Sequence, residues 1–213
     1  NVFGGAVILM DKPFRVGGYA PMNYDRTFKG PITLRTALAL SRNIPAVKLA
    51  QEVTPERVVR NAQNMGISTL VTSGSHNDIT LAMALGGLRR GLTPMDLASA
   101  FGVLANQGVR VEPVTILKVV DRNGKVLEQH VPKEKMVINE RVAFLLTDML
   151  RGVIQYGTGT GANIGRPAAG KTGTTDEHKD AWFVGYTPDI STSVWIGFDS
   201  DGTLDGQTGG EIP

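Results

Sequence analysis

The chain has 213 residues, of which 41% are hydrophobic and 20% are charged, a composition typical of a soluble globular protein. The formal net charge of +2 does not indicate a nucleic-acid-binding protein, and no apolar run approaches the length of a membrane span. The absence of cysteine excludes disulfides, thiolate metal sites and a cysteine nucleophile.

Helix signals occupy the middle of the chain in four segments. Thr33 opens the first, Thr54 and Thr93 are expected to cap the second and third, and the fourth and longest begins at Asn139. The second and third also place proline at the first helical position and glycine after the last turn. These patterns predict helices within residues 33–40, 54–66, 93–108 and 139–157.

Strand signals follow a different distribution. The sequence "TILKVVDRNGKVLEQ" predicts a hairpin around Asn123-Gly124, and three strands are expected in series at about 168–175, 181–187 and 192–198. Helices followed by antiparallel strands predict an α+β fold rather than a βαβ winding. We expect one unit over residues 1–213, with a helical part at about 30–156 and a sheet part at about 166–200.

A short polar triplet, Ser41-Arg42-Asn43, separates two helical patterns. Pro45 disfavours helical geometry at the residue before it and suits the first position of a new helix, so residues 41–44 are expected to form a loop. On a loop, the Ser41 and Asn43 side chains can face one cleft. The simpler alternative is that Ser41 or Asn43 caps the next helix.

The first strand of the C-terminal series carries Lys171-Thr172-Gly173-Thr174. Glycine weakens a strand interior and often marks the close approach of another backbone. A hydroxyl-rich, glycine-backed strand with one ammonium is therefore a good edge for an extended peptide that ends in a carboxylate.

The triplet and the lysine strand occur together with longer similar stretches. Ser-x-Asn followed by Lys-Thr-Gly belongs to the motif set of penicillin-binding proteins and serine β-lactamases. The stretches "YAPMNYDRTFKGPITLRTALALSRNIPAVKLA", "MALGGLRRGLTPMDLASAF", "GTGTGA" and "AGKTGTTDEHKDAWFVGYTPDISTSVWIGFD" resemble the transpeptidase domain of class A penicillin-binding proteins. The resemblance runs in order over nearly the whole chain, and it implies a β-lactamase/DD-transpeptidase-like fold.

The resemblance also implies roles for individual residues. Ser41 would relay a proton, and Asn43 would bind the substrate backbone or orient the lysine of the missing nucleophile motif. Lys171, with a pKa near 10.4, would supply positive charge beside Ser41. Thr172 and Thr174 would bind the substrate carboxylate, and the Thr174 N–H would contribute to an oxyanion hole. Gly173 would allow close approach of the substrate.

The sequence departs from the family at one point, because no lysine has a serine three residues before it. The nucleophile of the family is the serine of a Ser-x-x-Lys motif upstream of Ser-x-Asn. With no initiator Met or signal-peptide pattern, the chain is expected to be an incomplete domain that begins after this motif. Alone, it should neither turn over substrate nor become acylated by penicillin.

Two other functions remain open at this point, a serine β-lactamase and a non-catalytic β-lactam or peptidoglycan sensor. The Glu-x-x-Leu-Asn segment expected of a class A β-lactamase is absent. "GTGTG" at 157–161 lacks the context of a phosphate loop and predicts the end of a helix. The scattered histidines indicate no metal site.

The family resemblance further implies the surroundings of the protein. Stem peptides of peptidoglycan and β-lactams are the expected partners, with no cofactor and no nucleic acid. The expected location is the extracytoplasmic face of the bacterial membrane, held there by an anchor outside this sequence.

Overall fold

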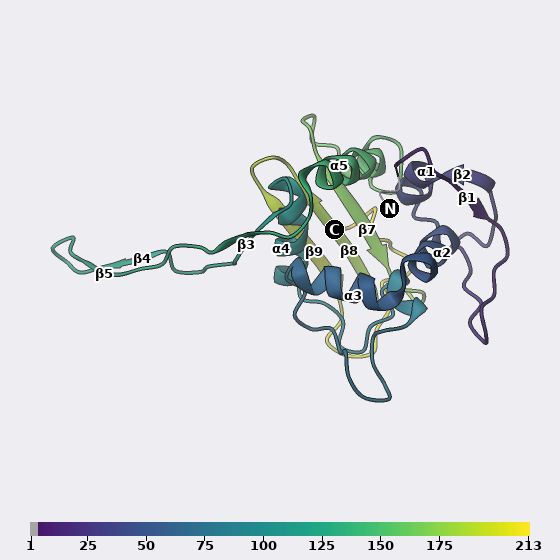
Figure 1. Cartoon of the computed structure of the whole chain (residues 1–213), viewed down its shortest axis with the longest axis horizontal. Coiled ribbons are helices and arrows are strands. Elements are labelled where there is room, and N and C mark those ends of the chain that lie inside the picture. Colours follow the sequence, from purple (N-terminus) through teal and green to yellow (C-terminus); the bar gives the residue numbers. More distant parts are fainter. Residues whose placement is uncertain (1–3) are drawn as a thin grey trace.

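The computed structural model describes residues 4–213 and contains helices together with small antiparallel sheets, as the sequence predicted (Figure 1). The main sheet has three strands in the order β7-β8-β9. All neighbouring strands run antiparallel, so the three expected C-terminal strands form one meander with β7 at an edge. The bounds are β7 Ala169–Thr174, β8 Asp180–Tyr186 and β9 Ser191–Gly197.

The predicted helices all form, and Thr54 and Thr93 stand at the expected N-cap positions, although the Thr54 side chain makes no capping hydrogen bond. Thr33 and Thr93 accept hydrogen bonds from the backbone N–H groups of Thr36 and Asp96, and Asn139 accepts from Arg141 N–H. The helices are α1 Leu34–Ala39, α2 Asn43–Val53, α3 Pro55–Asn64, α4 Pro94–Ala105 and α5 Glu140–Gln155, with 3₁₀ helices at Leu81–Leu85 and Thr160–Ala162.

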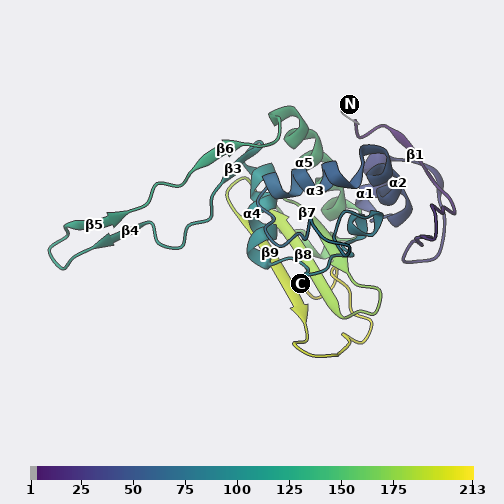
Figure 2. The same cartoon turned by 60° about the horizontal axis from the view of Figure 1, so that its bottom comes forward.

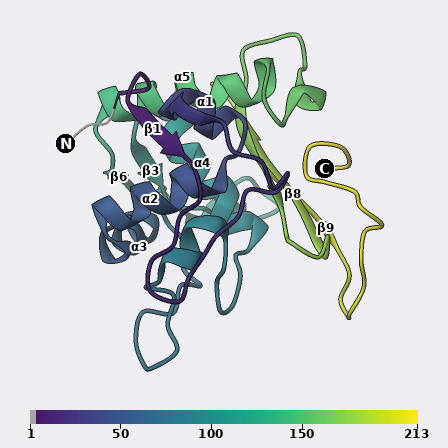
Figure 3. The same cartoon turned by 90° about the vertical axis from the view of Figure 1, so that its right-hand side faces the viewer.

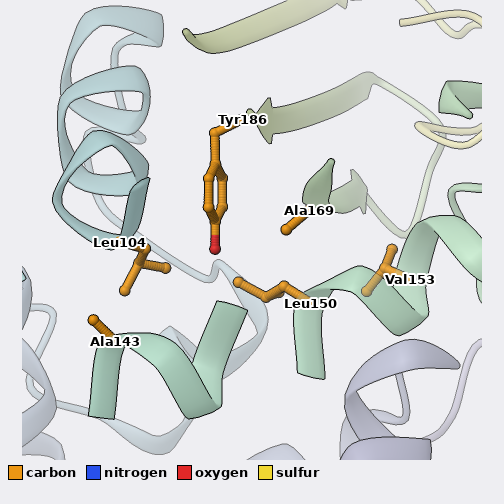
Figure 4. Close-up of a cluster of buried hydrophobic side chains, with 6 residues drawn as sticks. All are labelled: Leu104, Ala143, Leu150, Val153, Ala169 and Tyr186. Carbon is orange, nitrogen blue, oxygen red and sulfur yellow. The ribbon is translucent and has the colours of Figure 1, made fainter. Parts of the chain in front are cut away.

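The core lies between the main sheet and the helices α4 and α5. Helix α5 packs on β7, α4 packs on β8 and β9, and α1 packs against α5. One buried cluster joins these layers, and it consists of Leu104, Ala143, Leu150, Val153, Ala169 and Tyr186 (Figure 4). The Tyr186 hydroxyl donates to Thr147 Oγ1 at 2.9 Å, so the only polar end of this cluster is satisfied. Since Ala169 begins β7, the core fixes the strand that carries Lys171.

Two hairpins lie outside this core. Strands β1 (Ile8–Asp11) and β2 (Gly30–Thr33) form the first, which the sequence analysis did not predict. The second is a long arm in which β3 Val109–Val111 pairs with β6 Glu134–Met136 and β4 Lys118–Val120 pairs with β5 Val126–Gln129 (Figures 1 and 2). The turn at its tip contains Gly124, as expected, and the arm projects away from the sheet.

Trp182 and Trp195 were expected to pack across a hairpin, and they do. They are direct partners in the β8–β9 register, with ring centroids 6.3 Å apart.

Candidate active site

The ammonium of Lys171 lies 2.7 Å from the hydroxyl oxygen of Ser41, although 130 residues separate them in the sequence. Lys171 comes from the middle of the edge strand β7, and Ser41 from the turn between α1 and α2. Lys171 Nζ also donates to the carbonyl of Thr172 at 3.0 Å. The expected convergence of the two motifs on one place is therefore a feature of the fold.

The turn that carries Ser41 is tighter than the sequence predicted. Ser41 has a φ of 51°, and its N–H bonds to the Leu38 carbonyl while the Arg42 N–H bonds to the Ala37 carbonyl. A non-glycine residue in this left-handed region is uncommon, and such strain gathers at functional sites. Only three residues separate α1 from α2, and this tight turn places Ser41 Oγ beside Lys171 of β7.

The prediction of a loop over residues 41–44 is wrong for residues 43 and 44, which are helical. Asn43 is already the first residue of α2, and Pro45 is the third. Proline costs no hydrogen bond there, because the first N–H groups of a helix have no partner within the helix. The capping alternative is also wrong, since the N-cap residue is Arg42, and the Ile44 N–H in the first turn donates to Asn23 Oδ1 at 3.3 Å rather than to Ser41 or Asn43. The Asn43 amide nitrogen instead donates to the Met22 carbonyl at 2.8 Å.

Between Ser41 and Asn43, the Arg42 side chain is buried in an ionic network. Its Nε lies 2.9 Å from Asp11 Oδ2, and its Nη1 lies 2.7 Å from Asp25 Oδ2. Asn23 Nδ2 donates to the other Asp11 oxygen at 2.7 Å. The hydrogen bond from Arg42 holds the pKa of Asp25 well below its usual range. The network joins the triplet to the segment around β1, and the sequence analysis missed it.

Lys171 departs from the expected electrostatics. Burial lowers the pKa of Lys171 to about 8, whereas the sequence analysis expected a value near 10.4. Because desolvation disfavours the charged form, the lysine is an ammonium at neutral pH but loses its proton within a modest rise in pH. The lower pKa therefore changes the pH at which the positive charge is lost, and most Lys171 side chains are still charged at pH 7.

The two threonines of the strand are held by other parts of the chain. Thr172 Oγ1 lies 2.7 Å from Thr158 Oγ1, and Thr174 Oγ1 accepts a hydrogen bond from the N–H of Gly209 at 3.0 Å. On Gly173, an added Cβ would come 3.1 Å from the Cβ of Trp182. Thr172 and Thr174 are thus each held by a hydrogen bond from another segment of the chain.

The "GTGTG" segment ends α5, as expected, and it also forms part of the site. The Thr158 N–H donates to the Ala39 carbonyl at 3.1 Å, at the end of the helix that precedes Ser41. A Cβ on Gly157 would lie 2.2 Å from the same carbonyl oxygen. The segment therefore bridges the Ser41 turn and β7, and the tight Gly-Thr-Gly spacing was the signal for this role in the sequence.

Within residues 4–213, no cluster of His, Asp and Glu is suited to hold a metal ion, and no helix is long and apolar enough to cross a membrane. His178 contacts two segments that are distant in the sequence, with Nε2 3.2 Å from the Tyr24 hydroxyl and Nδ1 3.0 Å from the Gln207 carbonyl oxygen. The structure thus brings together the Ser41 hydroxyl and the buried Lys171 of a strand with two threonine hydroxyls, whereas the Asn43 amide contacts Met22.

Comparison with known proteins identifies the family. Residues 2–206 match the model of the penicillin binding protein transpeptidase domain. The chain is 41% identical over 188 residues to penicillin-binding protein 1A of Aquifex aeolicus and 37% identical over 199 residues to penicillin-binding protein 1F of Bacillus subtilis. These alignments cover 88% and 90% of this chain but only 25% and 27% of the relatives, so the chain spans about a quarter of their length.

A solved structure supports the same assignment. The PonA1 protein of Mycobacterium tuberculosis in complex with penicillin V superposes with a TM-score of 0.81 at 29% identity. The match covers 100% of this chain and 57% of that one. Sequence and fold therefore agree that this chain belongs to the penicillin-binding protein transpeptidase family.

Proposed function

We propose that this chain forms two walls of the active site of a D-alanyl-D-alanine transpeptidase that cross-links peptidoglycan. The observation that carries the proposal is the 2.7 Å contact between Lys171 Nζ and Ser41 Oγ within the two family motifs. The nucleophilic serine would come from a Ser-x-x-Lys segment outside this sequence. Stem peptides and β-lactams would be the ligands, by analogy with the penicillin V complex of the related protein.

In this reaction, the substrate's penultimate D-Ala carbonyl is attacked by the external serine, and the bond to the terminal D-Ala nitrogen breaks. The external serine would lose its proton to the lysine of its own motif, and the departing nitrogen needs a proton. Ser41 would relay it, because its hydroxyl would give its proton to the nitrogen and take a new one from that lysine. Lys171 donates a hydrogen bond to Ser41 Oγ, which stabilises the oxygen as its proton leaves. Asn43 would hold the peptide backbone with the part of its amide not used by Met22.

The edge of β7 would bind the rest of the substrate. Within residues 4–213, no strand pairs with the outer edge of β7, so an extended peptide could lie along it. The Thr172 and Thr174 hydroxyls would bind the terminal carboxylate, with Lys171 supplying positive charge. The Thr174 N–H and the N–H of the external serine would stabilise the tetrahedral oxyanion.

The surroundings of the protein follow from the same proposal. A transpeptidase acts on the extracytoplasmic face of the bacterial membrane, and the anchor and a glycosyltransferase domain would lie in parts of the full-length protein outside this chain. No cofactor is required, because the external serine and the residues above supply the chemistry.

The experiment uses the full-length protein that carries this chain. Wild-type protein should be acylated by fluorescent penicillin and should form cross-linked muropeptides from D-Ala-D-Ala peptides. Lys171→Ala and Ser41→Ala should abolish or strongly reduce both. Lys125→Ala is the matched control, since Lys125 lies exposed at the tip of the distant hairpin arm. Failure of the wild type to be acylated, or equal behaviour of Lys171→Ala and Lys125→Ala, would overturn the proposal.

A further inference from the structure

The segment after the main sheet returns to β7 and lies on the strand's backbone. The N–H of Gly209 donates to Thr174 Oγ1 at 3.0 Å, and this is the only contact within residues 4–213 that engages the Thr174 hydroxyl. Figure 3 shows the segment, in yellow, running back beside the strands to the C-terminus. A turn stabilises its end, because Glu211 Oε2 accepts from both the N–H and the hydroxyl of Thr208.

Two successive glycines make this approach possible. A Cβ on Gly209 would lie 2.2 Å from the carbonyl oxygens of both Gly173 and Trp182, and a Cβ on Gly210 would lie 2.2 Å from the Thr158 carbonyl oxygen. Neither glycine has a positive φ, so their backbone conformation is open to any residue. The close approach itself, and no special backbone angle, requires glycine at both positions.

The residues before Gly209 are also held in place, by contacts with His178. The Leu204 N–H donates to the His178 carbonyl at 2.8 Å, and His178 Nδ1 lies 3.0 Å from the Gln207 carbonyl oxygen. Residues 204–211 are therefore fixed both to the loop after β7 and to the strand. Gly209 has little freedom to move away from Thr174.

The direction of the hydrogen bond determines what Thr174 can offer to a ligand. A hydroxyl has one proton to donate and can accept two hydrogen bonds. Since Thr174 Oγ1 accepts from the Gly209 N–H, its own proton is left for another acceptor. We propose that Gly209 is a positioning residue, which orients the Thr174 hydroxyl as a donor to the carboxylate of the substrate or β-lactam.

This inference rests on the proposed function and names a residue that acts through Thr174. It predicts a specific pattern: a change at Gly209 should weaken recognition of a carboxylate and leave the remaining chemistry of acylation largely intact. A structural role alone would affect all ligands alike.

The experiment measures the second-order acylation rate of the full-length protein by mass spectrometry, with penicillin V and with its uncharged methyl ester. Gly209→Ala should slow acylation by penicillin V roughly 10- to 100-fold, the effect of one hydrogen bond to a charged group, relative to the ester. Thr174→Val should show the same selectivity, and Thr174→Ser should retain the wild-type behaviour. In the Thr174→Val background, Gly209→Ala should add little, because its target is already gone.

Controls separate this effect from misfolding. Gly18→Ala is the matched control, since a Cβ there meets nothing within 4 Å and its φ is not positive. If Gly209→Ala does not fold, Glu211→Ala loosens the turn without placing atoms against β7, and it should show the same selectivity to a smaller degree. Equal slowing with acid and ester, or fully additive losses with Thr174→Val, would overturn the inference. Absence of any wild-type acylation would instead refute the proposed function.

Discussion

Arg42, the residue that follows Ser41, forms a buried ion pair with Asp11. Their side chains are 5% and 0% exposed, and Nε and Oδ2 are 2.9 Å apart. Adjacent residues of one turn thus have different partners, since Ser41 contacts Lys171 while Arg42 contacts Asp11 and Asp25.

Removing Arg42 should destabilise the protein strongly. Arg42→Met leaves Asp11 buried without its cation, and breaking a buried pair in this way costs about 3–5 kcal/mol. Urea denaturation measures this free energy of unfolding. Arg166→Met is the matched control, because Arg166 and Asp189 form an exposed pair that should contribute less than about 1 kcal/mol. The double variant Arg42→Met/Asp11→Leu should recover part of the loss, and a loss larger than that of Arg42→Met would contradict the explanation.

The lowered pKa of Lys171 should make acylation by penicillin fall as the pH rises through about 8. Above that value the amine is neutral, so it attracts the carboxylate less and stabilises the Ser41 oxygen less. Rapid-mixing measurements from pH 6 to pH 10 on the full-length protein test this. Lys125→Ala should leave the profile unchanged, and a profile that is flat up to pH 10 would show that the charge on Lys171 does not matter.

Stability should change with the opposite sign over the same range. The folded-state pKa of Lys171, about 8, lies below the unfolded value near 10.4. Between these values the unfolded chain binds more protons, so the contribution of this group to stability rises with pH. In Lys171→Met, which has no titratable group here, the slope of unfolding free energy against pH should be smaller between pH 8 and 10. An unchanged slope would refute the lowered pKa.

The chain by itself should not be labelled covalently by fluorescent penicillin. It contains no serine three residues before a lysine, and Ser41 is proposed to transfer a proton and not to attack the substrate. Gel fluorescence of the isolated chain beside the full-length protein makes the comparison. A labelled band from the chain that disappears in Ser41→Ala would identify Ser41 as a nucleophile and contradict this assignment.

Gly157→Ala should impair both stability and acylation. The new Cβ would lie 2.2 Å from the Ala39 carbonyl oxygen, so the "GTGTG" segment must move away from the Ser41 turn. Overpacking of this kind typically costs about 1–3 kcal/mol. In Gly157→Ala, the thermal unfolding temperature and the acylation rate should both fall. In Gly18→Ala, both should stay at the wild-type values. A wild-type acylation rate in a folded Gly157→Ala protein would show that the segment does not contribute to the site.

The regular elements of the fold could be predicted because their signals are local. Capping residues and turn glycines lie within a few positions of the helices and strands they delimit, as at Thr93 and Gly124. The start of α2 was misplaced because proline is tolerated throughout the first helical turn, so Pro45 did not fix which residue came first. The hairpin β1–β2 was missed because its short strands, which contain Pro31, carry a weak pattern.

In the candidate site, too, local sequence patterns could be interpreted, whereas features that depend on distant contacts could not. The residue types and their family resemblance indicated Ser41, Asn43 and the Lys171 strand. The pKa of Lys171 depends on burial by distant segments, and the roles of Arg42 and Gly209 depend on partners that lie far away in the sequence. Tandem glycines at 209–210 were a visible signal, but only the fold shows that they lie against carbonyl oxygens.

The contact between Gly209 and Thr174 also constrains when the groove can form during synthesis. Contacts between distant positions are made late in folding, because the intervening chain must first be ordered. A chain shortened before residue 209 would leave the Thr174 hydroxyl without this hydrogen bond, even with the helices and strands already in place. Its capture of a carboxylate-bearing antibiotic should therefore be slower than that of the chain that includes Gly209.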